Sequence, residues 1–181
     1  MEDFISVDSK LGNISSEQPV VQRMNTTISN QNWYATYPRM KNISTNENVE
    51  TSMIWGCLWD ETLQWFIDTQ GKTQAEVGSD STEWGNYYNA TFEYTNTSGG
   101  TSTTISGTVI PTGSTERNKA NNIYDMAGNV GDFTLEGNNF KWRNTRGGNI
   151  TTSRKPVSYR YGNFPNGSGN PFGFRVHLCV K

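Results

Sequence analysis

The residues on which most enzymes and metal sites depend are scarce in this sequence. Its 181 residues include one histidine and two cysteines, too few for a zinc site. The glycine patterns that bind phosphates or dinucleotides are absent, and no serine occupies a nucleophile elbow. The single histidine, His177, lies in an alternating segment with no carboxylate or cysteine at a motif distance, so we interpret it as structural.

Long apolar runs and an excess of charge of one sign are also missing. Apolar residues make up 33% of the chain and the net charge is −2. No run approaches the length of a membrane span, and residues 1–10 lack the basic and then apolar pattern of a secretory signal. A nearly neutral chain lacks the basic stripe of a nucleic-acid-binding protein. We therefore expect no membrane insertion and no nucleic-acid partner.

The two cysteines, Cys57 and Cys179, lie far apart in the sequence. They could pair only if the two ends of the fold meet. Nothing else in the sequence indicates an oxidising compartment, so we favour two buried free thiols. A disulfide stays the alternative.

What the chain does contain is aromatic residues, at 12% with six Trp, together with 21 Asn and 22 Thr. The length suits one hydrophobic core and is too short for two ordinary domains. Asn and Thr favour turns, caps and local hydrogen bonds over long regular elements. The composition therefore predicts an α+β domain with short strands, one or two helices and much irregular loop. We expect residues 1–50 to pack on the same domain as residues 51–181.

Apolar periodicity predicts two helices. In residues 53–69 the apolar side chains recur at spacings of three and four, and Gly71 follows where a helix should stop. A shorter helix is predicted over residues 33–40, with Pro38 in its last turn or breaking it.

Two further segments predict strands. Residues 90–94 and 101–109 form a plausible hairpin around a Ser-Gly-Gly turn. Residues 172–180 alternate, which predicts a terminal strand with Phe174, Val176, Leu178 and Val180 on one buried face.

Four short motifs occur in a fixed order along the second part of the chain. They are Trp84-Gly85-Asn86, Asn122-Ile123-Tyr124-Asp125-Met126-Ala127-Gly128-Asn129-Val130, Arg146-Gly147-Gly148 and Gly173-Phe174-Arg175. This ordered set resembles the formylglycine-generating-enzyme (sulfatase-modifying factor) family, a variant of the C-type lectin fold. The resemblance covers about residues 53–176 and implies a C-type lectin-like domain over residues 51–181. It also singles out Arg146 and Arg175, whose guanidinium groups we expect to tie loop carbonyls together. The alternative is that both are surface arginines.

The departures from that family exclude its oxidase chemistry. The oxidase members carry two copper-binding cysteines between the last two motifs, and residues 149–172 contain no cysteine. Cys57 and Cys179 lie outside that interval and cannot replace them. Because the reaction needs a thiolate, we expect no formylglycine generation, no copper and no enzymatic activity of this type.

The resemblance implies one metal ion, a structural calcium. Carried over by position, its ligands are Asp125, the carbonyls of Gly128 and Val130, and the carboxylate of Asp132. Hard oxygen ligands suit calcium. Asp132 is one methylene shorter than the usual Glu of the family, and a solvated pair of acids in a turn is the alternative.

Without the copper-binding cysteines, the chain is more similar to the variable proteins of diversity-generating retroelements, of the phage tropism-determinant type. In those proteins the segment before the last strand is mutated to create new ligand-binding surfaces. The resemblance places the variable region at residues 142–172. The candidate ligand-binding residues are Trp142, Asn144, Asn149, Ile150, Thr151, Thr152, Tyr161, Gly162, Asn163, Phe164, Asn166, Gly169 and Asn170.

The function hypothesis is a display protein that binds an unidentified macromolecule, a protein or glycan on a cell surface. Aromatic anchors among small polar residues are typical of such binding surfaces. We expect a virion-associated or cytoplasmic prophage product that could be displayed on a surface. The alternatives are a virion or tail structural protein without adhesive role, and an enzyme using another mechanism on this fold. The sequence leaves the oligomeric state open.

Overall fold

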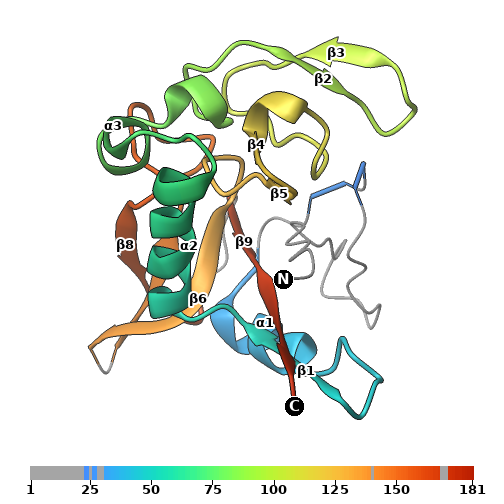
Figure 1. Ribbon diagram of the computed structural model, residues 1–181, viewed down its shortest axis with the longest axis vertical. Coiled ribbons are helices and arrows are strands. Elements are labelled where there is room, and N and C mark those ends of the chain that lie inside the picture. The colour runs from blue at the N-terminus through green and yellow to red at the C-terminus, as the bar shows by residue number, and fades with distance from the viewer. Residues whose placement is uncertain (1–22, 25, 28–30, 140, 168–170) are drawn as a thin grey trace.

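The computed structural model describes residues 23–24, 26–27, 31–139, 141–167 and 171–181, and it has the predicted α+β composition (Figure 1). The three helices are α1 (Trp33–Met40), α2 (Gly56–Thr69) and α3 (Gln74–Gly78). Two 3-10 turns cover Thr82–Trp84 and Glu116–Asn118. The strands are β1 (Val49–Met53), β2 (Glu93–Thr95), β3 (Thr101–Thr103), β4 (Lys119–Ala120), β5 (Ile123–Tyr124), β6 (Gly131–Asn139), β7 (Trp142–Arg146), β8 (Arg160–Asn163), β9 (Phe172–Phe174) and β10 (Val176–Val180).

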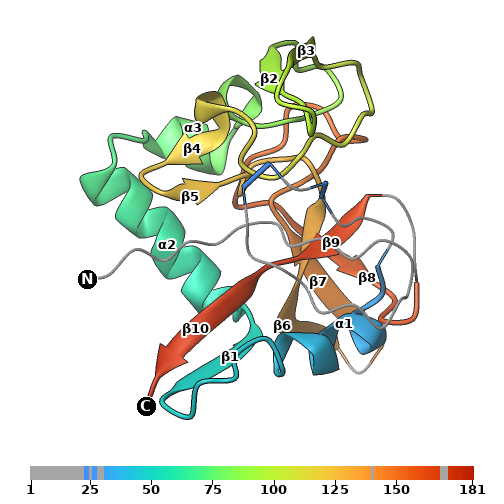
Figure 2. The ribbon, with the colours of Figure 1, turned by 90° about the vertical axis from the view of Figure 1, so that its right-hand side faces the viewer.

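A four-stranded sheet in the order β8-β7-β6-β9 forms the centre of the fold. Strand β6 pairs antiparallel with β7 and parallel with β9, and β8 pairs antiparallel with β7. The chain then continues into β10, which pairs antiparallel with β1 and so joins the end of the chain to its early part (Figure 2). Strand β8 lies at one edge of the sheet and carries three of the candidate binding residues, Tyr161, Gly162 and Asn163.

The helix predicted over residues 53–69 is confirmed, but it begins at Gly56. Met53 belongs instead to β1, where it pairs with Val176. A long-range strand pairing therefore overrides the local helical period at this end. The apolar stripe of α2 buries Trp59, Leu63 and Phe66 in a cluster that also contains Trp84, Tyr87 and Met126.

The shorter helix over residues 33–40 is confirmed as α1, with Pro38 inside it. The side-chain oxygen of Asn32 accepts a hydrogen bond from the backbone N–H of Ala35 at 2.8 Å, which caps the first turn. Met40 packs in a second cluster with Met53, Phe133, Phe174 and Val176. The described part of the first fifty residues thus packs on the same core as the rest.

The predicted hairpin is confirmed with shorter strands, since β2 and β3 pair over three residues each. The terminal strand is confirmed only in part. Phe174 and Val176 are buried, but Leu178 is 42% exposed and Val180 is 83% exposed. Beyond Val176 the strand belongs to the two-stranded β1–β10 ribbon, which extends past the main sheet (Figure 2).

The prediction of two buried free thiols is half right. Cys57 and Cys179 are both free, as favoured over a disulfide, but both are exposed. Cys57 lies in the first turn of α2 and Cys179 lies near the end of the ribbon, two places with no apolar cover in the described structure. Among the described residues, no helix is long and apolar enough to cross a membrane.

Candidate functional site

The first two motifs of the sequence meet in the core. Asn86 forms a parallel bridge with Gly128, and the backbone N–H of Asn129 donates to the Asn86 carbonyl at 2.7 Å. Gly128 has a φ of +75°, and a Cβ atom there would lie 2.4 Å from the Asn86 carbonyl oxygen. The side chain of Asn129 is fully buried and accepts from the backbone N–H of Ile110. These residues hold three loops together, so the motif is structural.

The third motif packs on the same junction. The carbonyl of Gly147 accepts from the backbone N–H of Gly128 at 2.9 Å and from the Tyr87 hydroxyl at 2.7 Å. Gly147 has a φ of +86°, and a Cβ atom would lie 2.4 Å from the Met126 carbonyl oxygen. The chain is therefore fixed where the candidate variable region begins.

Arg175 supplies the positive charge at the place where the resemblance implies calcium. Its guanidinium is completely buried, donates from Nε to the Asp132 carboxylate at 3.1 Å, and donates to the Asp125 carbonyl at 2.9 Å. The expectation that Arg175 ties a loop carbonyl is confirmed, and the surface alternative is wrong.

The carboxylate of Asp125 is used by protein donors as well. One oxygen accepts from the backbone N–H of Gly113 at 2.7 Å and the other from the Asn118 amide at 3.2 Å. Burial raises the pKa of the Asp125 carboxyl to about 6, so this side chain loses its negative charge at a higher pH than an exposed aspartate does. Calcium needs six to eight oxygen ligands. With Asp132 paired to Arg175 and Asp125 so engaged, the residues proposed as ligands do not fit a calcium ion.

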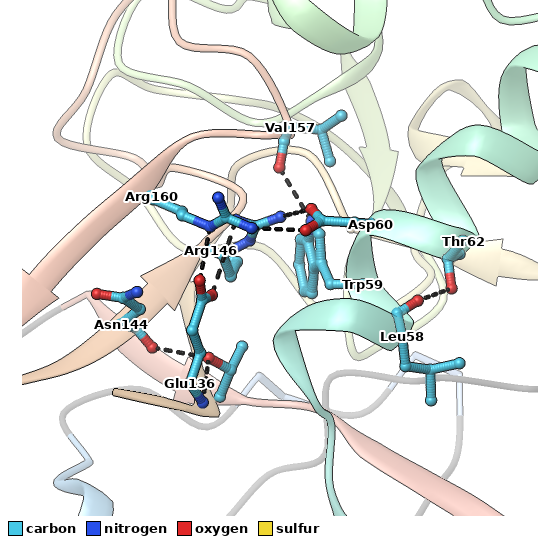
Figure 3. Close-up of polar contacts among 10 residues, drawn as sticks. Leu58, Trp59, Asp60, Thr62, Glu136, Asn144, Arg146, Val157 and Arg160 are labelled. Atoms are coloured by element: carbon cyan, nitrogen blue, oxygen red, sulfur yellow. Dashed lines mark hydrogen bonds and ion pairs between the residues drawn. The ribbon is translucent and has the colours of Figure 1, made fainter. Parts of the chain in front are cut away.

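Arg146 is the second arginine of the motifs, and it fixes the sheet to α2 (Figure 3). It is 1% exposed and pairs with the Asp60 carboxylate of α2 and, at 3.8 Å, with Glu136 of β6. Arg160 of β8 contacts the same two acids, Asp60 at 2.5 Å and Glu136 at 2.7 Å. Arg146 is thus a buried structural residue. It pairs with carboxylates, whereas the prediction was that it would bond loop carbonyls.

The exposed side of this scaffold is the edge strand β8 and the turn that follows it. We call Trp142, Tyr159, Tyr161, Asn163, Phe164 and Asn166 the edge surface. Tyr161 and Phe164 are each 53% exposed. The Phe164 ring stacks on Trp142 with centroids 4.2 Å apart, and Tyr161 stacks on Tyr159 at 6.3 Å. Each of these two aromatic pairs therefore has one exposed ring at this edge of the sheet.

The backbone under the edge surface is held in place. Strand β8 pairs with β7 over four residues. The Asn163 amide donates to the Thr145 hydroxyl at 3.0 Å, and the Pro165 carbonyl accepts from the backbone N–H of Trp33 at 3.0 Å. The next turn closes with a bond from Gly167 N–H to the Phe164 carbonyl at 2.9 Å. Gly162 is half-buried within β8 and Asn166 is exposed on the turn.

Three of the residues predicted to bind a ligand are buried, whereas the prediction placed them on the surface. Ile150 is 1% exposed, Asn144 is 6% exposed and Asn149 is 9% exposed. Ile150 is held by a bond from its N–H to the Asn129 carbonyl at 3.2 Å, which puts its side chain in the interior. Asn144 lies in the inner strand β7.

The polar loop at residues 149–152 is a closed turn. The Asn149 side-chain oxygen accepts from the N–H and the hydroxyl of Thr151, at 2.9 and 2.8 Å. The Thr152 hydroxyl donates to the Asn149 carbonyl at 2.8 Å. Thr151 is exposed and Thr152 is half-buried, but their hydroxyls bond within the turn. Gly169 and Asn170 lie outside the described residues.

The sequence reasoning missed Tyr159 and Arg160 at this edge and Tyr88 beside the turn at residues 149–152. Tyr88 is 53% exposed, and its backbone N–H donates to the Thr152 carbonyl at 3.0 Å, which places it beside the turn. The predicted binding segment begins at Tyr161 and therefore omits Tyr159 and Arg160. The pair of tyrosines spaced two apart in a strand was the available signal, since such residues share a face.

Comparison with known proteins supports the fold. The chain matches no protein-family model, and no curated protein matches its sequence. Among solved structures it is similar to Treponema denticola variable protein 1, with a TM-score of 0.56 and 16% identity. The match covers 87% of this chain and 72% of that one. The chain therefore has the α+β, C-type lectin-like fold of a variable protein, as the second resemblance implied. The likeness to formylglycine-generating enzymes and the phage origin stay predictions.

Proposed function

We propose that this chain is a non-catalytic display protein, in which the edge surface binds a macromolecule and the remainder is scaffold. The observation that carries the proposal is the exposure of Tyr161 and Phe164, each 53%, on a strand edge whose backbone is fixed from the other side. The diversification of such a surface by a retroelement of a phage or prophage is part of the same proposal.

The chemistry of the edge surface suits protein or glycan recognition. Tyr and Trp offer large contact areas with few rotatable bonds, and small polar neighbours provide adaptable hydrogen bonds. Here the paired rings of Trp142 and Phe164 restrict each other, which reduces the entropy lost when a partner binds. A few such aromatic anchors usually carry most of the binding energy.

The test uses two displayed libraries and a defined target, hen lysozyme. One library randomises Tyr161, Asn163, Phe164 and Asn166. The matched library randomises the buried residues Asn144, Asn149, Ile150 and Thr145. We expect most members of the first library to fold and to yield lysozyme binders after selection, because loop substitutions outside the core are tolerated. The second library should be largely unfolded.

Equal loss of folded protein in the two libraries would contradict the proposal, and so would a folded first library that yields no binder. The gene offers an independent check. Adenine-directed differences among sibling genes should fall on the codons of the edge surface and spare those for residues 144–150. Differences spread evenly over the codons of the edge surface and those for residues 144–150 would contradict diversification by a retroelement.

A further inference from the structure

Charge is distributed unevenly along the chain, and the edge surface belongs to its basic part. All 17 acidic residues lie at or before Glu136, and eight Lys and Arg residues follow it. Every residue of the edge surface comes from this part without acids. A basic side chain here must therefore find its carboxylate in an earlier segment of the chain or in another molecule.

Earlier segments supply carboxylates to three of these cations. The acids Asp60 and Glu136 serve Arg146 and Arg160, as described above. Arg175 has an aspartate of its own in the core. These ion pairs stabilise the scaffold, and the two acids beside β8 are already engaged in them.

Two cations in the turn before β8 have no such partner. Arg154 is exposed and Lys155 is half-buried, and neither forms an ion pair with any residue that the structure describes. Lys155 Nζ lies 4.7 Å from the centre of the Tyr159 ring, and Tyr159 stacks on Tyr161 at 6.3 Å. The Lys155 ammonium therefore borders the edge surface directly.

The segment after α3 brings one acid toward this turn. The backbone N–H of Ser81 donates to the Lys155 carbonyl at 3.1 Å. The preceding residue, Asp80, uses its carboxylate to accept from the N–H of Thr82 at 2.9 Å and from the Thr82 hydroxyl. Two cations against this one acid leave the turn with a positive charge.

An exposed tyrosine extends the basic turn further. Tyr88 bonds the Thr152 carbonyl through its N–H and is 53% exposed. A Cβ atom on Gly148 would lie 3.2 Å from Thr152 Oγ1 and 3.4 Å from Lys155 Cβ, so these two residues meet over Gly148. We call Tyr88, Arg154 and Lys155 the flank, since they border the edge surface on this side.

We infer that the partner bound by the edge surface is a protein with an acidic contact face, and that the flank meets that face. The inference rests on the proposed display function and narrows its partner. Arg154 and Lys155 attract the carboxylates of the partner, and Tyr88 adds aromatic contact area. Charges at the rim of an interface act mainly on the association rate, and salt screens them. The flank lies outside the randomised positions, so it contributes to every binder in the same way.

The test selects binders from the first library against two targets. Hen lysozyme is basic, and bovine α-lactalbumin has the same fold but is acidic. We expect more independent binders to α-lactalbumin at equal target concentration. In these binders Lys155→Gln and Arg154→Gln should each lower the association rate constant about two- to fivefold at low salt, the size of an exposed charge pair, and less at high salt. Lys181→Gln is the matched control, because it removes the same charge at the C-terminal end, which Figure 2 shows away from β8.

Charge reversal gives a change of sign that a structural role of Lys155 would not produce. Lys155→Glu should slow the association of the α-lactalbumin binders and speed that of the lysozyme binders, and both effects should fade at high salt. Unfolding curves of every variant show whether the fold is retained. If the Lys155 variants are unstable, Arg154→Gln and Arg154→Glu carry the test, because Arg154 is exposed.

Equal numbers of binders to the two targets would overturn the inference and leave the display function intact. Association rates that Lys155→Gln and Arg154→Gln leave unchanged would do the same. Saturable binding of the unselected chain to heparin that is lost in both variants would also overturn it, because the partner would then be an anionic glycan. No binder to either target would remove the display function, and the inference with it.

Discussion

Residues 144–150 and residues 159–167 each contain two Asn and two Gly but have opposite roles. Both segments lie within the candidate variable region. In the first, Asn149 and Ile150 are buried and the Ile150 N–H bonds the Asn129 carbonyl, whereas in the second Tyr161 and Phe164 are exposed. The difference teaches that a polar composition does not mark a surface. What decides is whether the fold places the side chains against the core.

The physical cause is the position of each segment relative to the sheet. The first segment leaves the inner strand β7 and passes over the junction of Gly128 and Asn129, so the core receives its side chains. The second segment is the edge strand β8, which has one neighbour within the described sheet. Substitutions at the two segments should therefore separate stability from binding.

The largest expected effect lies in the scaffold that both segments share. Trp59 is fully buried, its indole N–H donates to the Val157 carbonyl at 3.2 Å, and the Arg146 and Arg175 guanidinium groups lie 5.8 and 5.9 Å from its ring. Trp59→Ala should lower the free energy of unfolding by about 3–5 kcal/mol, measured by urea denaturation. A loss below about 1 kcal/mol, the size of an ordinary substitution, would show that α2 does not anchor the sheet.

The next effect distinguishes the first segment from a surface loop. Ile150→Ala should cost about 2 kcal/mol or more, because it leaves a cavity in a packed interior. The control is Ser153→Ala, three residues later on an exposed position, which should change stability by less than about 0.5 kcal/mol. Equal midpoints of denaturation for the two variants would contradict the burial of Ile150.

Two asparagines test the same contrast with one chemical change. Asn149→Ala removes the acceptor of the Thr151 N–H and hydroxyl and should cost about 1 kcal/mol. Asn166→Ala, on the exposed turn, should stay within about 0.5 kcal/mol. Thermal unfolding of the pair gives the comparison. Reversed magnitudes would mean that the closed turn does not stabilise the fold.

The edge surface should give small effects on stability and a large effect on binding. Tyr161→Ala should change the free energy of unfolding by at most about 0.5 kcal/mol. In a library member that was selected for lysozyme binding and retains Tyr161, the same substitution should weaken the affinity for lysozyme by about 2 kcal/mol, measured by surface plasmon resonance. A variant that unfolds before it loses affinity would make Tyr161 a structural residue.

The smallest expected effect concerns calcium. Because Arg175 already neutralises Asp132, the melting temperature should be the same with calcium and with a chelator. The contrast is Arg175→Met, which removes that cation and should destabilise the fold by about 3–5 kcal/mol, since a buried carboxylate loses its partner. A rise in melting temperature with calcium in the wild-type protein would restore the metal site.

Much of the fold could be predicted because its signals are local. The three- and four-residue spacing around Trp59 and Phe66 defines α2 wherever the helix packs. The order of the four motifs led to the C-type lectin-like fold, and the glycines at 128 and 147 are needed because no side chain fits there. Tyr161 and Phe164 were predicted as binding residues because their type favours a binding surface, and the structure shows that both are exposed.

The sequence by itself determined the core helix, the order of the four motifs and the lack of a cysteine between residues 149 and 172. Only the tertiary structure decided which polar residues are interior. Asp132 meets Arg175 from 43 positions away, and Asp60 meets Arg146 from 86. It also decided that Arg143 lies over the Trp33 ring, where it pairs with no acidic residue of the described chain. The reason is that burial and pairing depend on which segments the sheet brings together. The chemistry of a single residue does not specify these contacts between distant parts of the chain.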